Sequence, residues 1–254
     1  MPGEHAKLSA SGSKRWLNCP GSIVLEALYP EEDSSYAAEG TRAHALAEIT
    51  LRHLILRTVL KEDVFEADKA ADNDEMRRAV AEYVGYCQDL YDAMTLKYKS
   101  TKAFVEERVS YEEWVPGGFG TVDFSVIGGR ELHIVDLKYG KGVPVEAEDN
   151  PQPRLYALGA LHEYGFIYDV ETVTTHIVQP RLNSISTETL KVNELVTWAE
   201  TVREKAAIAY NNNRIYEPGD YCKFCKARFA CKARATGILA AIYDVLGGKH
   251  NGRL

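Results

Sequence analysis

The sequence lacks any hydrophobic run that approaches the roughly 18 apolar residues needed to cross a bilayer as a helix. Residues 1–16 are polar, so the chain also lacks the apolar stretch of a secretory signal. From these two absences we expect a protein that works in the cytoplasm and makes no contact with a membrane.

Positive charge is also scarce, since 30 lysines and arginines stand against 37 aspartates and glutamates, which leaves a net charge of -7. This balance argues against a protein that coats nucleic acid by bulk electrostatic attraction. A nuclease is compatible with it, because a metal site concentrates carboxylates and phosphate contacts can be local. Residues 221–234 form a local basic stretch without any acid, and its basic side chains are Lys223, Lys226, Arg228, Lys232 and Arg234.

Cysteine is sparse, with five residues, and without a secretion signal these thiols are expected to stay reduced. Cys222, Cys225 and Cys231 follow one another at a spacing that indicates a metal site with one ligand missing. Cys19 lies far upstream, whereas Cys87 falls on the apolar stripe of an expected helix and is interpreted as a small core residue. Spacing alone leaves zinc and an iron–sulfur cluster both open.

The chain has the composition of one sizeable globular domain, with 45% hydrophobic and 26% charged residues. Asp72 or Asn73 is the expected N-cap of its third helix. Three strands in a meander, followed by helix, strand and helix, predict a three-layer α/β core. The expected helices are 13–28, 36–60, 73–98, 150–164 and 192–213, and the expected strands are 103–111, 119–127, 131–139 and 171–179.

Asp123 lies among apolar residues in the expected strand 119–127. Because side chains alternate along a strand, Val122, Phe124 and Val126 share one face and Asp123 is expected on the other. We therefore expect the Asp123 carboxylate to point away from the apolar side of the sheet.

Asp136 and Lys138 lie two residues apart in the expected strand 131–139, on the face of its leucine and isoleucine. A carboxylate and an ammonium in an apolar strand are costly unless they are paired, hydrogen bonded or bound to an ion. Hydrolysis of a phosphodiester needs such a set, with carboxylates for Mg²⁺ or Mn²⁺ and an amine that orients water. Asp123 and Asp136 are then metal ligands. The alternative interpretation is an Asp136–Lys138 ion pair beside a solvated Asp123.

Two flanking elements carry further candidate ligands. His44 lies in the middle of the helix 36–60, with Glu48 one turn later, and its imidazole is a candidate third ligand, although a lone helical histidine is more often structural. Glu106 or Glu107, just ahead of the glycine turn, is a candidate for completing the metal coordination. The alternative interpretation of these acids is a solvated strand face.

Gln152 and Tyr156 lie one turn apart on the helix 150–164, where they can contact nucleic acid or steady Lys138. Taken alone they are unremarkable. Their place in the chain after the acids and the lysine completes an ordered pattern.

This pattern resembles the PD-(D/E)XK nuclease superfamily, which includes the C-terminal domain of RecB, the AddB nuclease domain and the iron–sulfur nucleases of CRISPR adaptation. The matching stretches are G-T-R-A-H (40–44), V-E-E (105–107), G-T-V-D (120–123), I-V-D-L-K-Y-G (134–140) and Q-P-R-L-Y (152–156). A closer resemblance, to an uncharacterised family of phage-encoded nucleases from recombination modules, is carried by L-S-A-S-G (8–12), R-W-L-N-C-P (15–20) and D-L-K-Y-G-K-G (136–142).

The resemblance implies a restriction-endonuclease-like core, in which helices flank a central mixed sheet, and a metal-dependent nuclease site. Glu106 is favoured over Glu107 as the acid of the motif that precedes the turn. The other residues that the resemblance implies are the Mg²⁺ or Mn²⁺ ligands His44, Asp123 and Asp136, the catalytic Lys138, and the following motif residues Gln152 and Tyr156.

The resemblance also implies a structural [4Fe–4S] cluster on Cys19, Cys222, Cys225 and Cys231, with zinc as the alternative at the same thiols. Joining chain ends so far apart removes about 5 kcal/mol of unfolded-chain entropy, by the logic of a long-loop disulfide. The expected parts are an N-terminal segment with Cys19 (1–35), a nuclease core (36–213) and a C-terminal iron–sulfur segment (214–254).

The expected function is that of an exonuclease acting on DNA ends in a bacterial or phage-infected cell, preparing single strands for a phage annealing or single-strand-binding protein. A structure-selective endonuclease is the nearest alternative. A different class is a catalytically inactive iron–sulfur scaffold that binds single strands by stacking, with Trp16, Trp114 and Tyr139 as candidate aromatics. The presence of every expected acid and of the lysine argues for activity.

Overall fold

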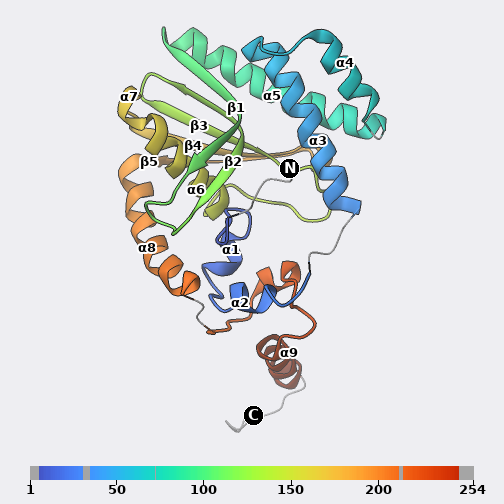
Figure 1. Ribbon diagram of the computed structural model, residues 1–254, viewed down its shortest axis with the longest axis vertical. Coiled ribbons are helices and arrows are strands. Elements are labelled where there is room, and N and C mark those ends of the chain that lie inside the picture. Colours follow the sequence, from blue (N-terminus) through green and yellow to red (C-terminus); the bar gives the residue numbers. More distant parts are fainter. Residues whose placement is uncertain (1–5, 31–34, 72, 212–213, 246–254) are drawn as a thin grey trace.

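A five-stranded mixed sheet forms the centre of the computed structural model, which describes residues 6–30, 35–71, 73–211 and 214–245 (Figure 1). Its strands, in spatial order, are β1 (Thr101–Ser110), β2 (Phe119–Gly128), β3 (Glu131–Leu137), β4 (Thr172–Gln179) and β5 (Ser184–Lys191). Strands β1, β2 and β3 form the expected antiparallel meander, β4 runs parallel to β3, and β5 runs antiparallel to β4.

Helices flank both faces of this sheet, which confirms the prediction of an α/β core. None of those in the described ranges is long and apolar enough to cross a bilayer. In chain order the helices are α1 (Ser13–Trp16), α2 (Ser22–Glu26), α3 (Ser35–Leu51), η1 (Arg52–Leu56), α4 (Lys61–Lys69), α5 (Asp74–Lys97), α6 (Pro151–Ala160), η2 (Leu161–Gly165), α7 (Phe166–Tyr168), η3 (Pro180–Leu182), α8 (Val192–Tyr210), η4 (Asp220–Phe224) and α9 (Lys232–Val245).

Two hydrophobic cores lie on opposite faces of the sheet. On one face, α3 and α5 pack on a cluster that includes Val135 and Leu137 of β3. On the other face, α6 and α8 pack on a cluster that includes Leu132 and Ile134 of the same strand. Alternate residues of β3 thus pack into different cores. Each layer of helices is held to the sheet because its apolar stripe is buried against one of these cores.

The helix start predicted at Asn73 is confirmed, because the Asn73 side chain accepts a hydrogen bond of 2.9 Å from the backbone N–H of Met76 at the start of α5. The alternative cap Asp72 lies outside the described residues. The expected helix 36–60 ends earlier, at Leu56, after a π-turn that leads to a left-handed Arg57.

Strand β5 and helices α4 and α9 are present although the sequence patterns did not predict them. In β5 the alternating residues are half-buried and exposed, with Ser, Thr and Glu in place of apolar residues. It is an edge strand of the sheet, and an edge strand keeps its pairing through backbone hydrogen bonds without a strong apolar stripe. Composition therefore gave little signal for it.

The prediction that Val122 and Phe124 share a face, with Asp123 opposite, is wrong. Val122 belongs to the core under α6 and α8, whereas Phe124 belongs to the core under α3 and α5. Asp123 lies on the Phe124 side, where it contacts a side chain of α3. The reason is a break in the pleat, since Glu106, opposite Asp123 in the register of β1 and β2, has a left-handed backbone with φ of 50°.

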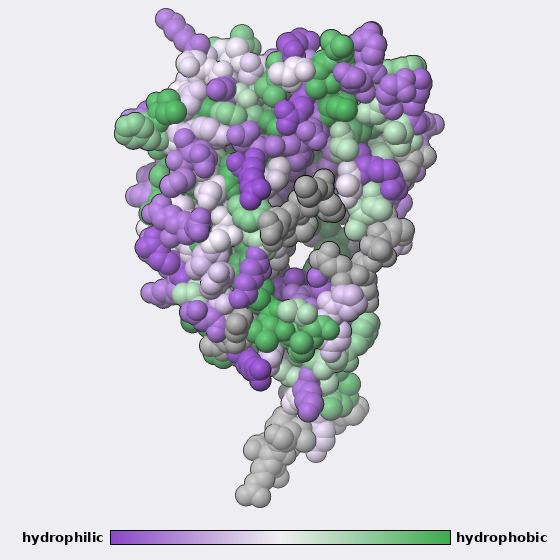
Figure 2. Space-filling view, viewed as in Figure 1, coloured by the Kyte–Doolittle hydropathy of each residue, from purple (hydrophilic) through white to green (hydrophobic). Residues whose placement is uncertain are grey.

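The N-terminal and C-terminal segments lie side by side below the sheet (Figure 1). The Gly21 N–H donates to the Ile215 carbonyl at 2.8 Å, and a side chain at Gly21 would meet the Tyr216 ring at 2.6 Å. Glycine is needed there because the two segments approach so closely. In the space-filling view, hydrophilic residues cover much of the upper part, and the surface is hollowed where it meets the lower part (Figure 2).

Candidate metal centre and cysteine pocket

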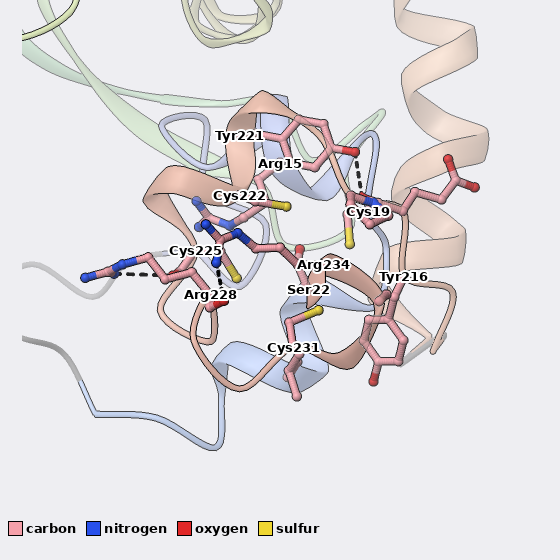
Figure 3. A pocket seen from close by; sticks show the side chains of 14 residues that line it. Arg15, Cys19, Ser22, Tyr216, Tyr221, Cys222, Cys225, Arg228, Cys231 and Arg234 are labelled. Carbon is pink, nitrogen blue, oxygen red and sulfur yellow. Dashed lines mark hydrogen bonds between the residues drawn. The ribbon is translucent and has the colours of Figure 1, made fainter. Parts of the chain in front are cut away.

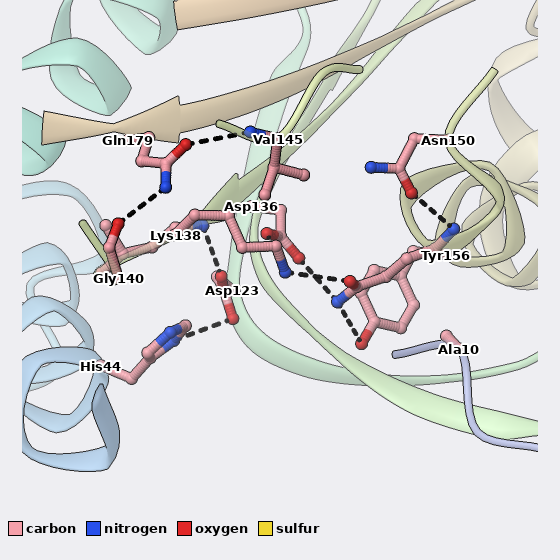
Figure 4. A network of polar contacts seen from close by, with 12 residues as sticks. Ala10, His44, Asp123, Asp136, Lys138, Gly140, Val145, Asn150, Tyr156 and Gln179 are labelled. Atoms are coloured by element: carbon pink, nitrogen blue, oxygen red, sulfur yellow. Dashed lines mark hydrogen bonds and ion pairs between the residues drawn. The ribbon is translucent and has the colours of Figure 1, made fainter. Parts of the chain in front are cut away.

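Three potential metal ligands from different elements meet beside the sheet. Ligand atoms of His44 on α3, Glu106 on β1 and Asp123 on β2 all lie within 4.8 Å of one another. His44 Nδ1 lies 3.2 Å from Asp123 Oδ1, and Asp123 Oδ2 accepts a hydrogen bond of 2.7 Å from the Leu137 N–H (Figure 4). The backbone of β3 thus fixes one oxygen of Asp123 and leaves the other turned toward the imidazole.

Glu106 and Glu107, which the sequence could not separate, point in different directions. Glu106 joins His44 and Asp123, whereas the Glu107 carboxylate accepts a hydrogen bond of 2.9 Å from the Tyr164 hydroxyl. The left-handed backbone at Glu106 accounts for this, because it turns the side chain toward α3. A non-glycine residue at positive φ costs of order 1 kcal/mol, and such strain is concentrated at functional sites.

Asp136, Lys138, Gln152 and Tyr156 form a second polar group that borders the first. Lys138 Nζ lies 2.7 Å from Asp136 Oδ2 and donates to Gln152 Oε1 at 2.9 Å. Gln152 Nε2 in turn donates to Asp136 Oδ1 at 2.9 Å and lies 3.4 Å from the Tyr156 hydroxyl (Figure 4). We refer to this group together with His44, Glu106 and Asp123 as the carboxylate centre. Gly120 belongs to its frame, since a Cβ there would meet the Tyr156 ring at 2.6 Å.

Burial and neighbouring charges perturb the acids and the imidazole. Burial and, after it, the charge of Asp123 raise the pKa of Glu106 to about 7. Burial also raises the pKa of Asp136, against the opposing effect of the Lys138 ammonium. Burial alone would lower the pKa of His44, but the hydrogen bond and charge of Asp123 outweigh it and raise that pKa to about 9. Without an ion, a protonated imidazole therefore balances the carboxylates.

All seven residues that the sequence analysis assigned to this site lie in the carboxylate centre. Asp136 is not within the 4.8 Å set of His44, Glu106 and Asp123, because it is paired with Lys138 and Gln152. Its buried Oδ2 is the oxygen that the Lys138 ammonium contacts, so the positive charge of Lys138 offsets the burial of this acid.

Two supporting residues were not found from the sequence. Arg52 donates to the Val105 carbonyl at 2.9 Å, next to the strained Glu106, and pairs with Glu48. Gln179 donates to the Gly140 carbonyl at 2.7 Å, which anchors the loop after Lys138 (Figure 4). The spacing of four residues between Glu48 and Arg52 was the only available signal, and it is common on exposed helices.

Four of the five cysteines line one pocket, which we call the cysteine pocket (Figure 3). These are Cys19, Cys222, Cys225 and Cys231. Among the described residues, no three of these sulfurs lie within 4.8 Å of one another. Burial raises the pKa of Cys19 and raises that of Cys225 to about 11. The fifth cysteine, Cys87, lies on α5 and is fully buried in the core, as expected.

Contacts between the chain ends surround the cysteine pocket. Glu26, which is buried, accepts hydrogen bonds from Arg15 at 2.9 Å and from the Lys226 N–H at 2.8 Å. Lys14 and Asp220 pair at 2.8 Å on the surface. These contacts run between short helices and turns, so little regular secondary structure holds the thiols in place.

The aromatic residues proposed for stacking do not suit that role. Trp16, Trp114 and Tyr139 are 1%, 6% and 4% exposed, and the Trp16 Nε1–H donates to the Ser9 carbonyl at 2.9 Å. Each lies in a hydrophobic core, where its area stabilises the fold. Their burial therefore argues against the stacking role for which the scaffold alternative named them as candidates.

Comparison with known proteins gives a family and distant structural neighbours. A solved structure titled "Crystal structure of SSO0001" is 15% identical over 92% of this chain and 89% of that chain, with a TM-score of 0.38. So low a TM-score supports no argument about fold or activity. A family profile described as "Protein of unknown function (DUF2800)" matches residues 5–248, nearly the whole sequence. The chain therefore belongs to the DUF2800 family.

Proposed function

We propose that the protein is a Mg²⁺- or Mn²⁺-dependent DNA nuclease of the PD-(D/E)XK type. The observation that carries the proposal is the convergence of an imidazole, two carboxylates and a further Asp–Lys pair on adjacent strands. Oxygen and imidazole ligands of this kind suit a hard divalent ion. The left-handed backbone that turns Glu106 toward His44 and Asp123 supports a functional role for this group.

The donor set fits one divalent ion held by His44, Glu106 and Asp123, with Asp136 at its border. Such an ion supplies positive charge for the scissile phosphate and lowers the pKa of water. Lys138, fixed between Asp136 and Gln152, orients the attacking water through its ammonium. Gln152 accepts a hydrogen bond from that lysine, and the buried Tyr156 hydroxyl holds Gln152 in turn.

The mode of action proposed is exonucleolytic, on DNA ends, in keeping with the phage recombination nucleases that the sequence resembles. A partner that anneals or covers the resulting single strand belongs to the same proposal. The exonuclease mode and the partner are supported by the resemblance alone. The carboxylate centre would cleave a phosphodiester in the same way in an exonuclease or an endonuclease.

A [4Fe–4S] cluster in the cysteine pocket is the second part of the proposal. Four thiols from both chain ends line that pocket, and thiolates are the ligands of such clusters. A single zinc with bonds of 2.3 Å needs its sulfurs about 3.8 Å apart, which is closer than any three of them lie here. The wider arrangement favours a cluster of several irons, whose role is to join the two ends of the chain.

The decisive experiment is digestion of end-labelled linear DNA and covalently closed circular DNA with Mg²⁺, Mn²⁺ or a chelator. We expect cleavage of the linear DNA with either ion, none with chelator, and resistance of the closed circles. Cleavage of the circles would instead indicate an endonuclease.

The matched variant for this assay is Asp136→Ala. We expect it to bind DNA but to cleave at less than about one thousandth of the original rate, because the metal contribution amounts to several kcal/mol. A catalytically inactive scaffold has no cleavage to lose. Digestion that persists in Asp136→Ala or in chelator contradicts the nuclease proposal.

A further inference from the structure

Two phenylalanines of the C-terminal segment are exposed on the surface. Phe224 is 62% exposed and Phe229 is 83% exposed. A cation contacts each ring, because Lys223 Nζ lies 5.0 Å from the Phe224 centroid and the Arg228 guanidinium lies 4.6 Å from the Phe229 centroid. We call this pair of rings with their two cations the aromatic surface.

The backbone beneath the aromatic surface is well fixed. Cys225 and Ala227, which alternate with these exposed residues, are 7% and 1% exposed and anchor the segment inward. Arg15 donates to the Phe224 carbonyl at 3.4 Å, and the Lys226 N–H donates to buried Glu26. The rings are thus presented from a held backbone, so a ligand that contacts them pays little ordering entropy.

The charge around the aromatic surface is positive in a chain that is otherwise acidic. Residues 221–234 contain five basic side chains and no acid, while the whole chain carries a net charge of -7. The nearest acid in sequence, Asp220, is paired with Lys14. A polyanion with flat aromatic groups matches such a surface, since its phosphates meet the cations and its bases stack on the rings.

We propose that Phe224 and Phe229 form a binding site for single-stranded DNA outside the carboxylate centre. The bases stack on the two rings, and Lys223 and Arg228 contact the neighbouring phosphates. Stacking requires unpaired bases, which selects single strands over duplex. The choice of DNA as the polymer rests on the proposed nuclease function, whereas the stacking itself rests on this surface alone.

The test measures binding without cleavage, by fluorescence anisotropy of a labelled oligothymidylate with the full-length holoprotein in chelator. We expect Phe224→Ala and Phe229→Ala each to weaken the Kd about tenfold, as loss of one base–aromatic stack does. An abasic oligomer of the same length should bind equally weakly to the original protein and to the double variant. Phe→Tyr at both positions should restore binding of oligothymidylate, whereas Phe→Leu should not.

Phe65 supplies a matched control. It is 59% exposed and carries Lys69 at 4.3 Å, but it lies on α4 among Glu62, Asp63 and Glu66. Phe65→Ala should leave the Kd unchanged, because a phosphate chain is repelled there.

Full affinity in the Phe224→Ala/Phe229→Ala double variant overturns the proposal, as does full affinity in the Phe→Leu variants, which would indicate an apolar protein-docking surface. Absence of any binding of oligothymidylate by the original protein overturns it as well. The two proposals can fail separately. If the original protein never cleaves DNA but the double variant loses binding of oligothymidylate, the nuclease proposal is refuted and the binding site is supported. Melting curves of the variants should match the original, because both rings lie on the surface.

Discussion

The carboxylate centre and the cysteine pocket are held in opposite ways. Around the carboxylates, three strands and two helices fix each side chain, and backbone and side-chain hydrogen bonds orient Asp123, Lys138 and Gln152 before any ion arrives. Around the thiols, short helices and turns from the two chain ends meet through a few polar contacts. Under the proposed function, the first region is a preformed site for a metal ion, whereas the second is a junction that the proposed cluster would complete.

Because of this difference, removal of one ligand residue should affect activity in the first region and stability in the second. Loss of one carboxylate leaves the sheet, both cores and the fold intact, so the effect should be confined to chemistry. Loss of one thiolate would remove the cross-link that the proposed cluster makes between distant parts of the chain, so the effect should appear as lost stability.

The largest effect is expected for Cys19→Ser, which removes the one thiol that the N-terminal segment contributes to the cysteine pocket. The free energy of unfolding should fall by about 4 kcal/mol, because the long loop between the chain ends is no longer closed. Chemical denaturation together with iron and zinc analysis measures it. Cys87→Ala is the control and should keep the metal content. Unchanged stability and metal content in Cys19→Ser would break the contrast.

The next effect is expected for the neighbouring acids of β1. Glu106→Gln should lower the rate of DNA cleavage about a hundredfold, since it weakens a ligand of the proposed ion. Glu107→Gln should cleave normally, because an amide oxygen still accepts the hydrogen bond of Tyr164. Initial rates at fixed Mg²⁺ with melting temperatures distinguish the two variants. Equal losses would show that the left-handed turn at Glu106 does not select the ligand.

These assignments also indicate how far the sequence alone leads. His44, Asp136 and Lys138 were predictable because functional side chains in apolar strands or in the middle of a helix stand out against an otherwise regular pattern. The approach of Asp123 on β2 to Asp136 on β3 was predictable from strand order, since a short turn joins these two strands. The face of Asp123 was not predictable, because alternation assumes a regular backbone and the sequence carries no sign of the left-handed residue opposite it.

Solvent exposure of the aromatic side chains was the other property that could not be predicted from the sequence. Trp16, Trp114 and Tyr139 were candidates for stacking in the scaffold alternative, yet tertiary packing buries all three. Phe224 and Phe229 stay at the surface because their segment directs its cysteine and alanine inward instead. Burial depends on contacts between distant residues, and local patterns report it poorly where secondary structure is short.

A smaller effect, on the free energy of unfolding, is expected when the pH is lowered, and it arises in the sheet that carries the carboxylate centre. Buried His176 on β4 accepts or donates a hydrogen bond of 2.7 Å with Tyr86 and lies 3.0 Å from His133. Burial lowers the pKa of His133 and lowers that of His176 to about 3. The pKa of His176 is lower in the folded chain than in the unfolded chain. The contribution of neutral His176 to the free energy of unfolding is therefore fully present above about pH 6.5 and is lost as the pH falls toward 3.

At pH 5 the loss should reach about 2 kcal/mol for His176, since the unfolded chain takes up a proton that the folded chain excludes. Urea denaturation at pH 7 and pH 5 measures it. His176→Gln should be less stable at pH 7 but should lose less on acidification. His162→Gln, at an exposed histidine, should keep the original pH dependence. An acid response that His176→Gln does not alter would place the sensitivity elsewhere, with the cysteine pocket as the next candidate.

The smallest effect is expected for Arg52→Met, and it tests whether the carboxylate centre is truly preorganised by its frame. Arg52 holds the Val105 carbonyl, so its loss frees the peptide that sets the left-handed turn at Glu106. The Mg²⁺ concentration for half-maximal cleavage should rise about tenfold, as loss of an outer partner of a metal ligand does. The rate at saturating Mg²⁺ should change little, because the metal then selects the competent arrangement. Arg57→Met, at the exposed end of the same π-turn, should keep the original requirement, and an Arg52→Met variant that never recovers at high Mg²⁺ would assign Arg52 to the DNA instead of the frame.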